Sequence, residues 1–190
     1  MKATILFLLF FFQFNIITAQ ESAFTKIKEL YYKANSDNYQ THNLNMHTKQ
    51  AAIGLQNTNV VFYYDSWQAK PEESHYKLKY HVVKIEVSYN VSASMDYKIE
   101  YLFDENKNLI FYYKKVEGMW ENSSLRYYLD KNKLIKVVSI STDEDGKSED
   151  YSDTKKFNQS DVNFANEYIQ KSKEYLSFFN EMIEIEKLDK

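Results

Sequence analysis

Polar and apolar residues alternate with period two through the middle of the chain. From Tyr97 to Phe103, aromatic and aliphatic residues alternate with residues such as Lys98 and Glu100, the pattern of a strand with one buried face. Further runs rich in β-branched and aromatic residues lie at 60–64, 109–116, 125–129 and 134–140, with a short one around Tyr151. With residues 76–89, these runs predict about six or seven strands joined by short turns.

The apolar positions change parity within one predicted strand. Between residues 76 and 82 they are even-numbered, whereas between residues 83 and 89 they are odd-numbered. Because strand side chains point alternately to the two faces, one regular strand cannot bury both sets on the same face. A β-bulge or a bend near His81–Val83 would realign them. We therefore predict one long bent strand, or two strands that share a corner.

Helical periodicity is confined to the two ends of the chain. Apolar residues recur every three or four positions from Glu21 to about Ala34, and again from Asp161 to Leu188. Ser160 is the predicted N-cap of the second helix. A run of strands between two terminal helices predicts an α+β fold, with one antiparallel meander sheet and both helices packed on one face. Residues 39–58 are expected to form a short strand and a loop.

The first nineteen residues have the features of a secretory signal peptide. Lys2 precedes a short apolar stretch that ends at Ala19, and this stretch is too short and too interrupted for a membrane span. We therefore expect residues 1–19 to be removed, and residues 20–190 to form one domain with no transmembrane segment. The chain has no cysteine, which excludes lipoprotein anchoring and disulfides. Together these features favour a bacterial periplasmic or secreted protein.

Composition excludes several kinds of chemistry. The formal net charge is -3, and lysines are interspersed with acids, so no basic surface for nucleic acid is expected. Three glycines provide neither a phosphate-binding loop nor a Gly-x-Ser-x-Gly nucleophile turn. His42 and His47 have the wrong spacing for a zinc motif, and His75 and His81 are expected to face solvent. We therefore expect no metal and no cofactor.

Two turns repeat the same local pattern. Residues 101–110 read YLFDENKNLI and residues 128–135 read YLDKNKLI, so in both an aromatic strand leads through Asp and Asn to Leu-Ile. About forty residues of the chain thereby resemble the hairpins of YD-type and MORN-like repeat proteins, which are common in small exported bacterial proteins. The resemblance implies meander geometry. Those hairpins usually have glycine where this chain has Lys107, so Asn106 or Asn108 is expected to adopt the left-handed conformation.

Three residues are the candidate binding residues. Trp67 and Trp120 lie in predicted loops, 65–74 and 118–124, where aromatic side chains serve as binding anchors or as lids over the core. Arg126 is the only arginine, and its planar guanidinium binds carboxylates at two points. It is expected to pair with Glu100 or Glu121, to lie at the surface, or to anchor a ligand.

These features favour a non-catalytic binding or interaction protein. Its partner would be an unknown protein, or a small apolar or sugar ligand carried between sheet and helix in a pocket lined by tyrosine and phenylalanine. The alternative from another class is a hydrolase that uses two carboxylates among Glu86, Glu100 and Glu121. That chemistry requires two carboxyl groups in one cleft, roughly 5–9 Å apart.

Overall fold

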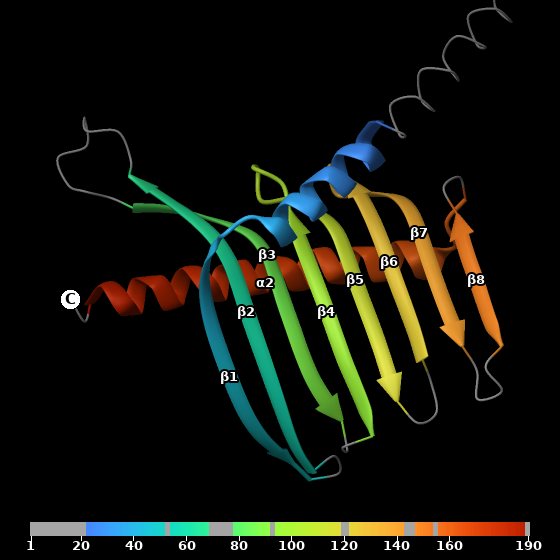
Figure 1. Cartoon of the computed structure of the whole chain (residues 1–190), viewed down its shortest axis with the longest axis horizontal. Helices are drawn as coiled ribbons and strands as arrows, with labels where there is room; N and C mark the ends of the chain where they lie inside the picture. Colours follow the sequence, from blue (N-terminus) through green and yellow to red (C-terminus); the bar gives the residue numbers. More distant parts are fainter. Residues whose placement is uncertain are drawn as a thin grey trace, which may run out of the picture.

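Eight antiparallel strands form one meander sheet (Figure 1). The structure is a computed structural model, and it describes residues 22–51, 54–68, 78–91, 94–118, 122–142, 147–153 and 156–188. The strands pair strictly in sequence order: β1 (Gln40–Gln50), β2 (Gly54–Gln68), β3 (Leu78–Val91), β4 (Met95–Phe103), β5 (Leu109–Gly118), β6 (Asn122–Asp130), β7 (Lys133–Thr142) and β8 (Ser148–Asp153). The α+β antiparallel fold is therefore confirmed, with eight strands where six or seven were predicted. The predicted signal peptide lies outside the described residues.

The two helices cover opposite faces of the sheet, and the prediction that both pack on one face is wrong. The N-terminal helix, helical over residues 22–36, packs through Ile27 and Ala34 on Leu102 and Phe111. The C-terminal helix α2 (Gln159–Leu188) packs on the other face, over side chains of opposite parity. The physical reason is that β4, β5 and β6 bury consecutive residues at one end, which provides an apolar surface on each face.

Aromatic side chains hold α2 against the sheet. The ring of Tyr168 stacks on that of Tyr112 with 3.8 Å between centroids. Phe179, 1% exposed, lies against the rings of Phe62 and Tyr64. The helix begins two residues earlier than predicted, and the Oδ1 of Asn158, rather than the Ser160 hydroxyl, accepts a hydrogen bond from the backbone amide of Asp161 at 2.7 Å.

The predicted irregularity in the third strand is a β-bulge at Val83. Tyr63 pairs with Lys84 and Tyr64 pairs with Val82, so Val83 has no partner in β2. The extra residue switches the side chains after it to the opposite face. Val82 and Ile85 are therefore both buried against α2 in a single long strand, which confirms the first of the two alternatives.

The two repeated turns form hairpins of similar construction. In each, the register shifts just after the turn and skips the isoleucine of the Leu-Ile pair, Ile110 or Ile135. In the first turn Lys107 itself has φ 62°, so the expectation that Asn106 or Asn108 takes this conformation is wrong. The Asp104 carboxylate accepts hydrogen bonds from the backbone amides of Asn106 and Asn108, both at 2.9 Å. Lys107, between them, is the left-handed residue.

Candidate functional site

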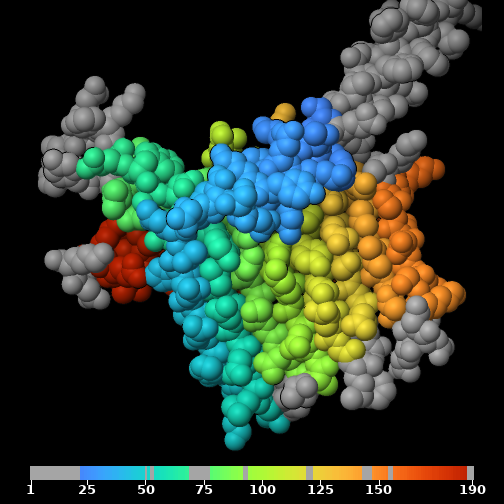
Figure 2. Space-filling model, viewed as in Figure 1, coloured from blue at the N-terminus to red at the C-terminus, as the bar shows by residue number. Residues whose placement is uncertain are grey.

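The N-terminal helix crosses only one end of its sheet face and leaves the rest of that face open (Figure 2). Four side chains form a row along the edge of the helix, because they are register partners on neighbouring strands: Glu86 with Glu100, Glu100 with Tyr113, and Tyr113 with Arg126. Cross-strand partners lie on the same face, about 4.5–5.5 Å apart between Cβ atoms. This row brings Arg126 and two of the three candidate glutamates together.

Glu100 is buried beneath the N-terminal helix, at 2% exposure. Its carboxylate pairs with the Lys98 ammonium at 2.7 Å and accepts the Tyr31 hydroxyl at 2.9 Å. Burial, together with the charge of Glu100, raises the pKa of the Tyr31 phenol, so this hydroxyl stays protonated and donates at neutral pH. Glu100 was predicted to lie outside; its burial follows from the helix that covers this face.

Glu86 has a similar set of donors. Its carboxylate pairs with the Lys84 ammonium at 2.7 Å and accepts the Tyr63 hydroxyl at 3.3 Å. Lys84 also donates to the Asn35 side chain at 2.7 Å, which ties the end of the N-terminal helix to the sheet. Both glutamates therefore have a lysine and a tyrosine as partners, which is an arrangement of structural ion pairs.

A cleft of about 450 Å³ lies between the N-terminal helix and this row, and we call it the helix cleft. Its walls are aromatic, formed by Tyr31, Tyr32, Phe111, Tyr113 and Tyr128. Four cationic side chains line it: Lys28, Lys98, Lys115 and Arg126. The only acidic group among its lining residues is Glu100, whose two oxygens already have donors. Lys98 pairs with Glu100 and Lys115 pairs with Glu117 outside the lining. Lys28 and Arg126 therefore give the helix cleft its positive charge, in a chain of net charge -3.

Arg126 has no carboxylate within ion-pair distance among the residues that the structure describes. Its guanidinium lies 5.2 Å from the centre of the Tyr113 ring, in cation–π geometry. The expected pair with Glu100 is absent because Lys98 occupies that carboxylate, and Glu121 lies outside the described residues. Lys28 likewise lies over an aromatic ring, that of Phe24, at 4.5 Å.

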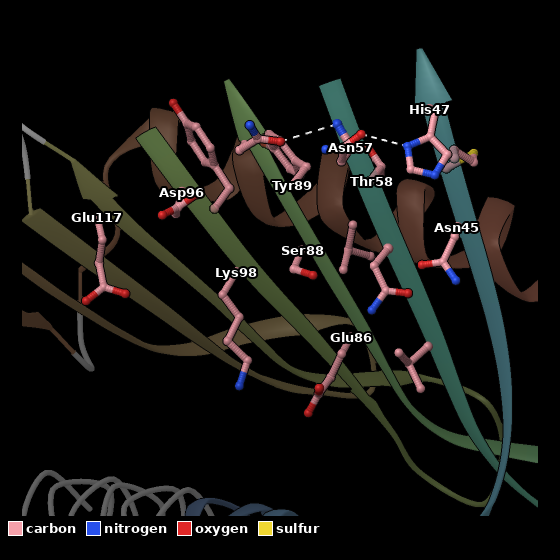
Figure 3. Close-up of a pocket in the computed structure, with 16 residues that line it drawn as sticks. Asn45, His47, Asn57, Thr58, Glu86, Ser88, Tyr89, Asp96, Lys98 and Glu117 are labelled. Atoms are coloured by element: carbon pink, nitrogen blue, oxygen red, sulfur yellow. Dashed lines mark hydrogen bonds between the residues drawn. The ribbon is translucent and has the colours of Figure 1, made fainter. Parts of the chain in front are cut away.

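A second depression, the polar hollow, lies beside the helix cleft on the same face (Figure 3). It has a volume of about 520 Å³ and is lined mainly by amide, hydroxyl and charged side chains from β1 to β5. His47 Nδ1 lies 2.7 Å from Asn57 Oδ1, and the backbone amide of Asn57 donates to the Asn90 side chain at 3.2 Å. The polar hollow and the helix cleft share Lys98.

The opposite face has a groove beside α2 of similar volume, about 520 Å³. Five tyrosines line it: Tyr89, Tyr101, Tyr112, Tyr168 and Tyr175. The groove is open rather than enclosed, and the interface under α2 is filled by the core. Of its two lysines, Lys171 pairs with Glu174 at 3.1 Å, and Glu167 adds a further negative charge. It therefore lacks the charge asymmetry of the helix cleft.

Of the two candidate tryptophans, Trp67 does not line this site. Trp67 lies in β2 rather than in a loop, is half exposed at 49%, and lines neither the helix cleft nor the polar hollow. Trp120 lies outside the described residues. His81 is half-buried rather than solvent-facing, and burial lowers the pKa of its imidazole. Sequence reasoning missed the strand tyrosines of the helix cleft, such as Tyr113, because strand alternation predicted that tyrosines belong to the core. The pairing register was needed to place Tyr113 beside Arg126.

Within the described ranges, no three metal-ligating side chains converge. No helix in the same part of the chain has the length and apolar content needed to cross a membrane. No protein-family model, curated protein or solved structure matches the chain.

Proposed function

We propose that this chain is an exported, non-catalytic binding protein that holds a small anionic ligand in the helix cleft. The observation that carries this proposal is Arg126: a half-buried guanidinium with no carboxylate partner among the described residues, at the edge of an aromatic cleft. A planar guanidinium offers paired donors that match the two oxygens of a carboxylate. An anion there would supply the missing countercharge.

The surroundings of Arg126 favour a ligand with a ring or another flat body. The Tyr113 ring lies under the guanidinium and restricts its motion, which lowers the entropy lost on binding. Tyr32 is 71% exposed on the facing helix and offers a large surface at low conformational cost. Aromatic walls with a few placed polar groups are the usual composition of small-molecule sites.

Binding without catalysis is favoured by the state of the two glutamates. Glu86 and Glu100 are neighbours on one face, as the hydrolase hypothesis requires. However, each of their four oxygens already has a lysine or tyrosine partner. A general acid or a nucleophile needs a free oxygen within reach of the substrate. We therefore assign these carboxylates to holding the helix on the sheet.

Calorimetric titration tests the proposal with two pairs of probes: benzoate against benzamide, and glucuronate against glucuronamide. In each pair only the anion should bind, because the pairs differ mainly in charge. Arg126→Gln should weaken binding about 10- to 100-fold, the equivalent of the roughly 1.5–3 kcal/mol of hydrogen bonds to a charged group. Lys133→Gln, a matched loss of one charge at an exposed position on β7, is the control. Binding of neither anion, or equal binding by Arg126→Gln, would refute the proposal.

A further inference from the structure

We propose that the helix cleft and the polar hollow form one continuous site for an acidic oligosaccharide. A uronate residue would occupy the cleft, and neutral sugar residues would lie over the hollow. This inference rests on the proposed function, because the carboxylate of the uronate is the anion that Arg126 binds. It adds the chemical class of the ligand and a second set of binding residues.

The two depressions are continuous across neighbouring strands. Ser88 of the hollow is the register partner of Lys98, and Lys98 is the register partner of Lys115 of the cleft. Figure 3 shows Asn45, Ser88 and Lys98 in order across the strands on one face. From Arg126 on β6 to Asn59 on β2 the track crosses four strand spacings, about 19 Å. This is long enough for a ligand of several rings.

The hollow offers the functional groups that recognise sugar hydroxyls. Four asparagines line it: Asn45, Asn57, Asn59 and Asn90. Each amide has both a donor and an acceptor, as a sugar hydroxyl does. Asn45 and Asn59 are register partners, and neither side chain has a partner among the described residues. The Asn57 side chain, by contrast, is held by His47. The first pair is therefore available to a ligand.

The position of the hollow disfavours a peptide. A bound peptide usually pairs its backbone with an exposed edge strand, with side chains in apolar pockets. The hollow lies on the face of β1 to β5. Within the sheet, the backbones of β2 to β5 are already paired on both sides, and β1 is paired on one. Its lining combines amides, hydroxyls and charges with a few apolar side chains, such as Met46 and Val61. A ligand that lies across this face would be recognised through side chains, and one rich in hydroxyls would match the polar ones.

The charges along the track set the direction of the ligand. Lys28 and Arg126 lie at the cleft end, whereas Asp96 and Glu117 lie at the margin of the hollow on β4 and β5, where Glu117 pairs with Lys115 at 2.6 Å. Asp96 and Glu117 are register partners on β4 and β5. These carboxylates accept hydrogen bonds from hydroxyls but repel a second acidic sugar. The site therefore fits a chain with one uronate at the cleft end.

The experiment compares three probes by calorimetry: glucuronate, xylotriose, and xylotriose that carries one glucuronate. The substituted xylotriose should bind at least about tenfold more tightly than glucuronate, since one or two added hydrogen bonds correspond to that factor. The double variant Asn45→Ala/Asn59→Ala should abolish this gain and leave glucuronate binding unchanged. Arg126→Gln should weaken both acidic probes. Asn166→Ala, at an exposed position on α2, is the matched control, and thermal unfolding verifies that every variant is folded.

Two results would overturn the inference and leave the proposed function intact. One is Arg126-dependent glucuronate binding with no gain from the xylotriose part. The other is an equal effect of the double variant on both acidic probes, because the asparagines would then not contact the neutral sugars. Failure of every anion to bind, including benzoate, would refute the proposed function itself. Equal binding of unsubstituted xylotriose would contradict the acidic specificity.

Discussion

The ion pair between Lys84 and Glu86 should contribute far more to stability than the similar pair between Lys115 and Glu117. Each pair joins residues two apart on one strand, at 2.7 Å and 2.6 Å respectively. The lysine side chain is 4% exposed in the first pair and 42% exposed in the second. The same substitution, Lys→Met, therefore isolates the effect of burial.

The expected magnitude follows from what the ammonium group contacts. Lys84 bonds to Glu86 and Asn35 and lies 4.3 Å from the centre of the Tyr63 ring. Removing one partner of a buried ion pair typically costs about 3–5 kcal/mol. Because the Glu86 side chain stays 24% exposed to water, we expect about 2–4 kcal/mol for Lys84→Met. An exposed pair contributes under about 1 kcal/mol, which is the expected limit for Lys115→Met.

Urea unfolding at neutral pH measures the difference. With a slope of about 1–3 kcal/mol per molar urea, Lys84→Met should lower the midpoint by on the order of 1 M. Adding Glu86→Leu to Lys84→Met should recover much of the loss, because an apolar pair leaves no buried charge without a partner. Equal midpoints for Lys84→Met and Lys115→Met would refute the reasoning. A double variant no more stable than Lys84→Met would contradict the assigned cause.

Three further predictions concern stability. Burial lowers the pKa of His81 below its usual 6.5, and the negative charge of Asp65 offsets part of this shift. The unfolded chain therefore binds the proton more tightly than the folded protein does. The free energy of unfolding should be highest above about pH 6.5 and should fall as the pH drops below that value. Urea midpoints at about pH 7.5 and 5.5 should show a smaller drop for His81→Gln than for the wild type, and an equal drop would exclude His81 as the source. Lys107→Gly relieves a left-handed lysine at φ 62° and should raise the free energy of unfolding by about 0.5–1 kcal/mol; a lower melting temperature would count against this. Phe179→Ala removes the contacts with Phe62 and Tyr64 and leaves a cavity, so it should lower the free energy of unfolding in urea by about 3–5 kcal/mol. A loss under about 1 kcal/mol would contradict this, because it would mean that neighbouring side chains fill the cavity.

Local patterns predicted most of the fold, because strand alternation and helical periodicity are local properties. The bulge at Val83 was predictable because the apolar positions change from even-numbered to odd-numbered at this point of the sequence. The placement of the N-terminal helix on the same face as α2 was wrong, because the odd positions of 97–103 were taken as the only buried set. Leu102, at 1% exposure, belongs to the other set, and the helix that covers it starts some eighty residues earlier in the chain.

The candidate site depends on pairing register, which alternation alone does not give. Arg126 was selected because it is the only arginine, but its neighbours follow from three successive strand pairings. One of these pairings, between β4 and β5, contains the bulge at Ile110, which shifts the register by one residue. A sequence argument that ignores this bulge places Glu100 opposite the wrong residue of β5 and so breaks the row that leads to Arg126. The sequence contains Lys-x-Glu triplets at residues 84–86, 98–100 and 115–117. It does not show that the N-terminal helix buries one side chain of each of the first two ion pairs and leaves both side chains of the third exposed.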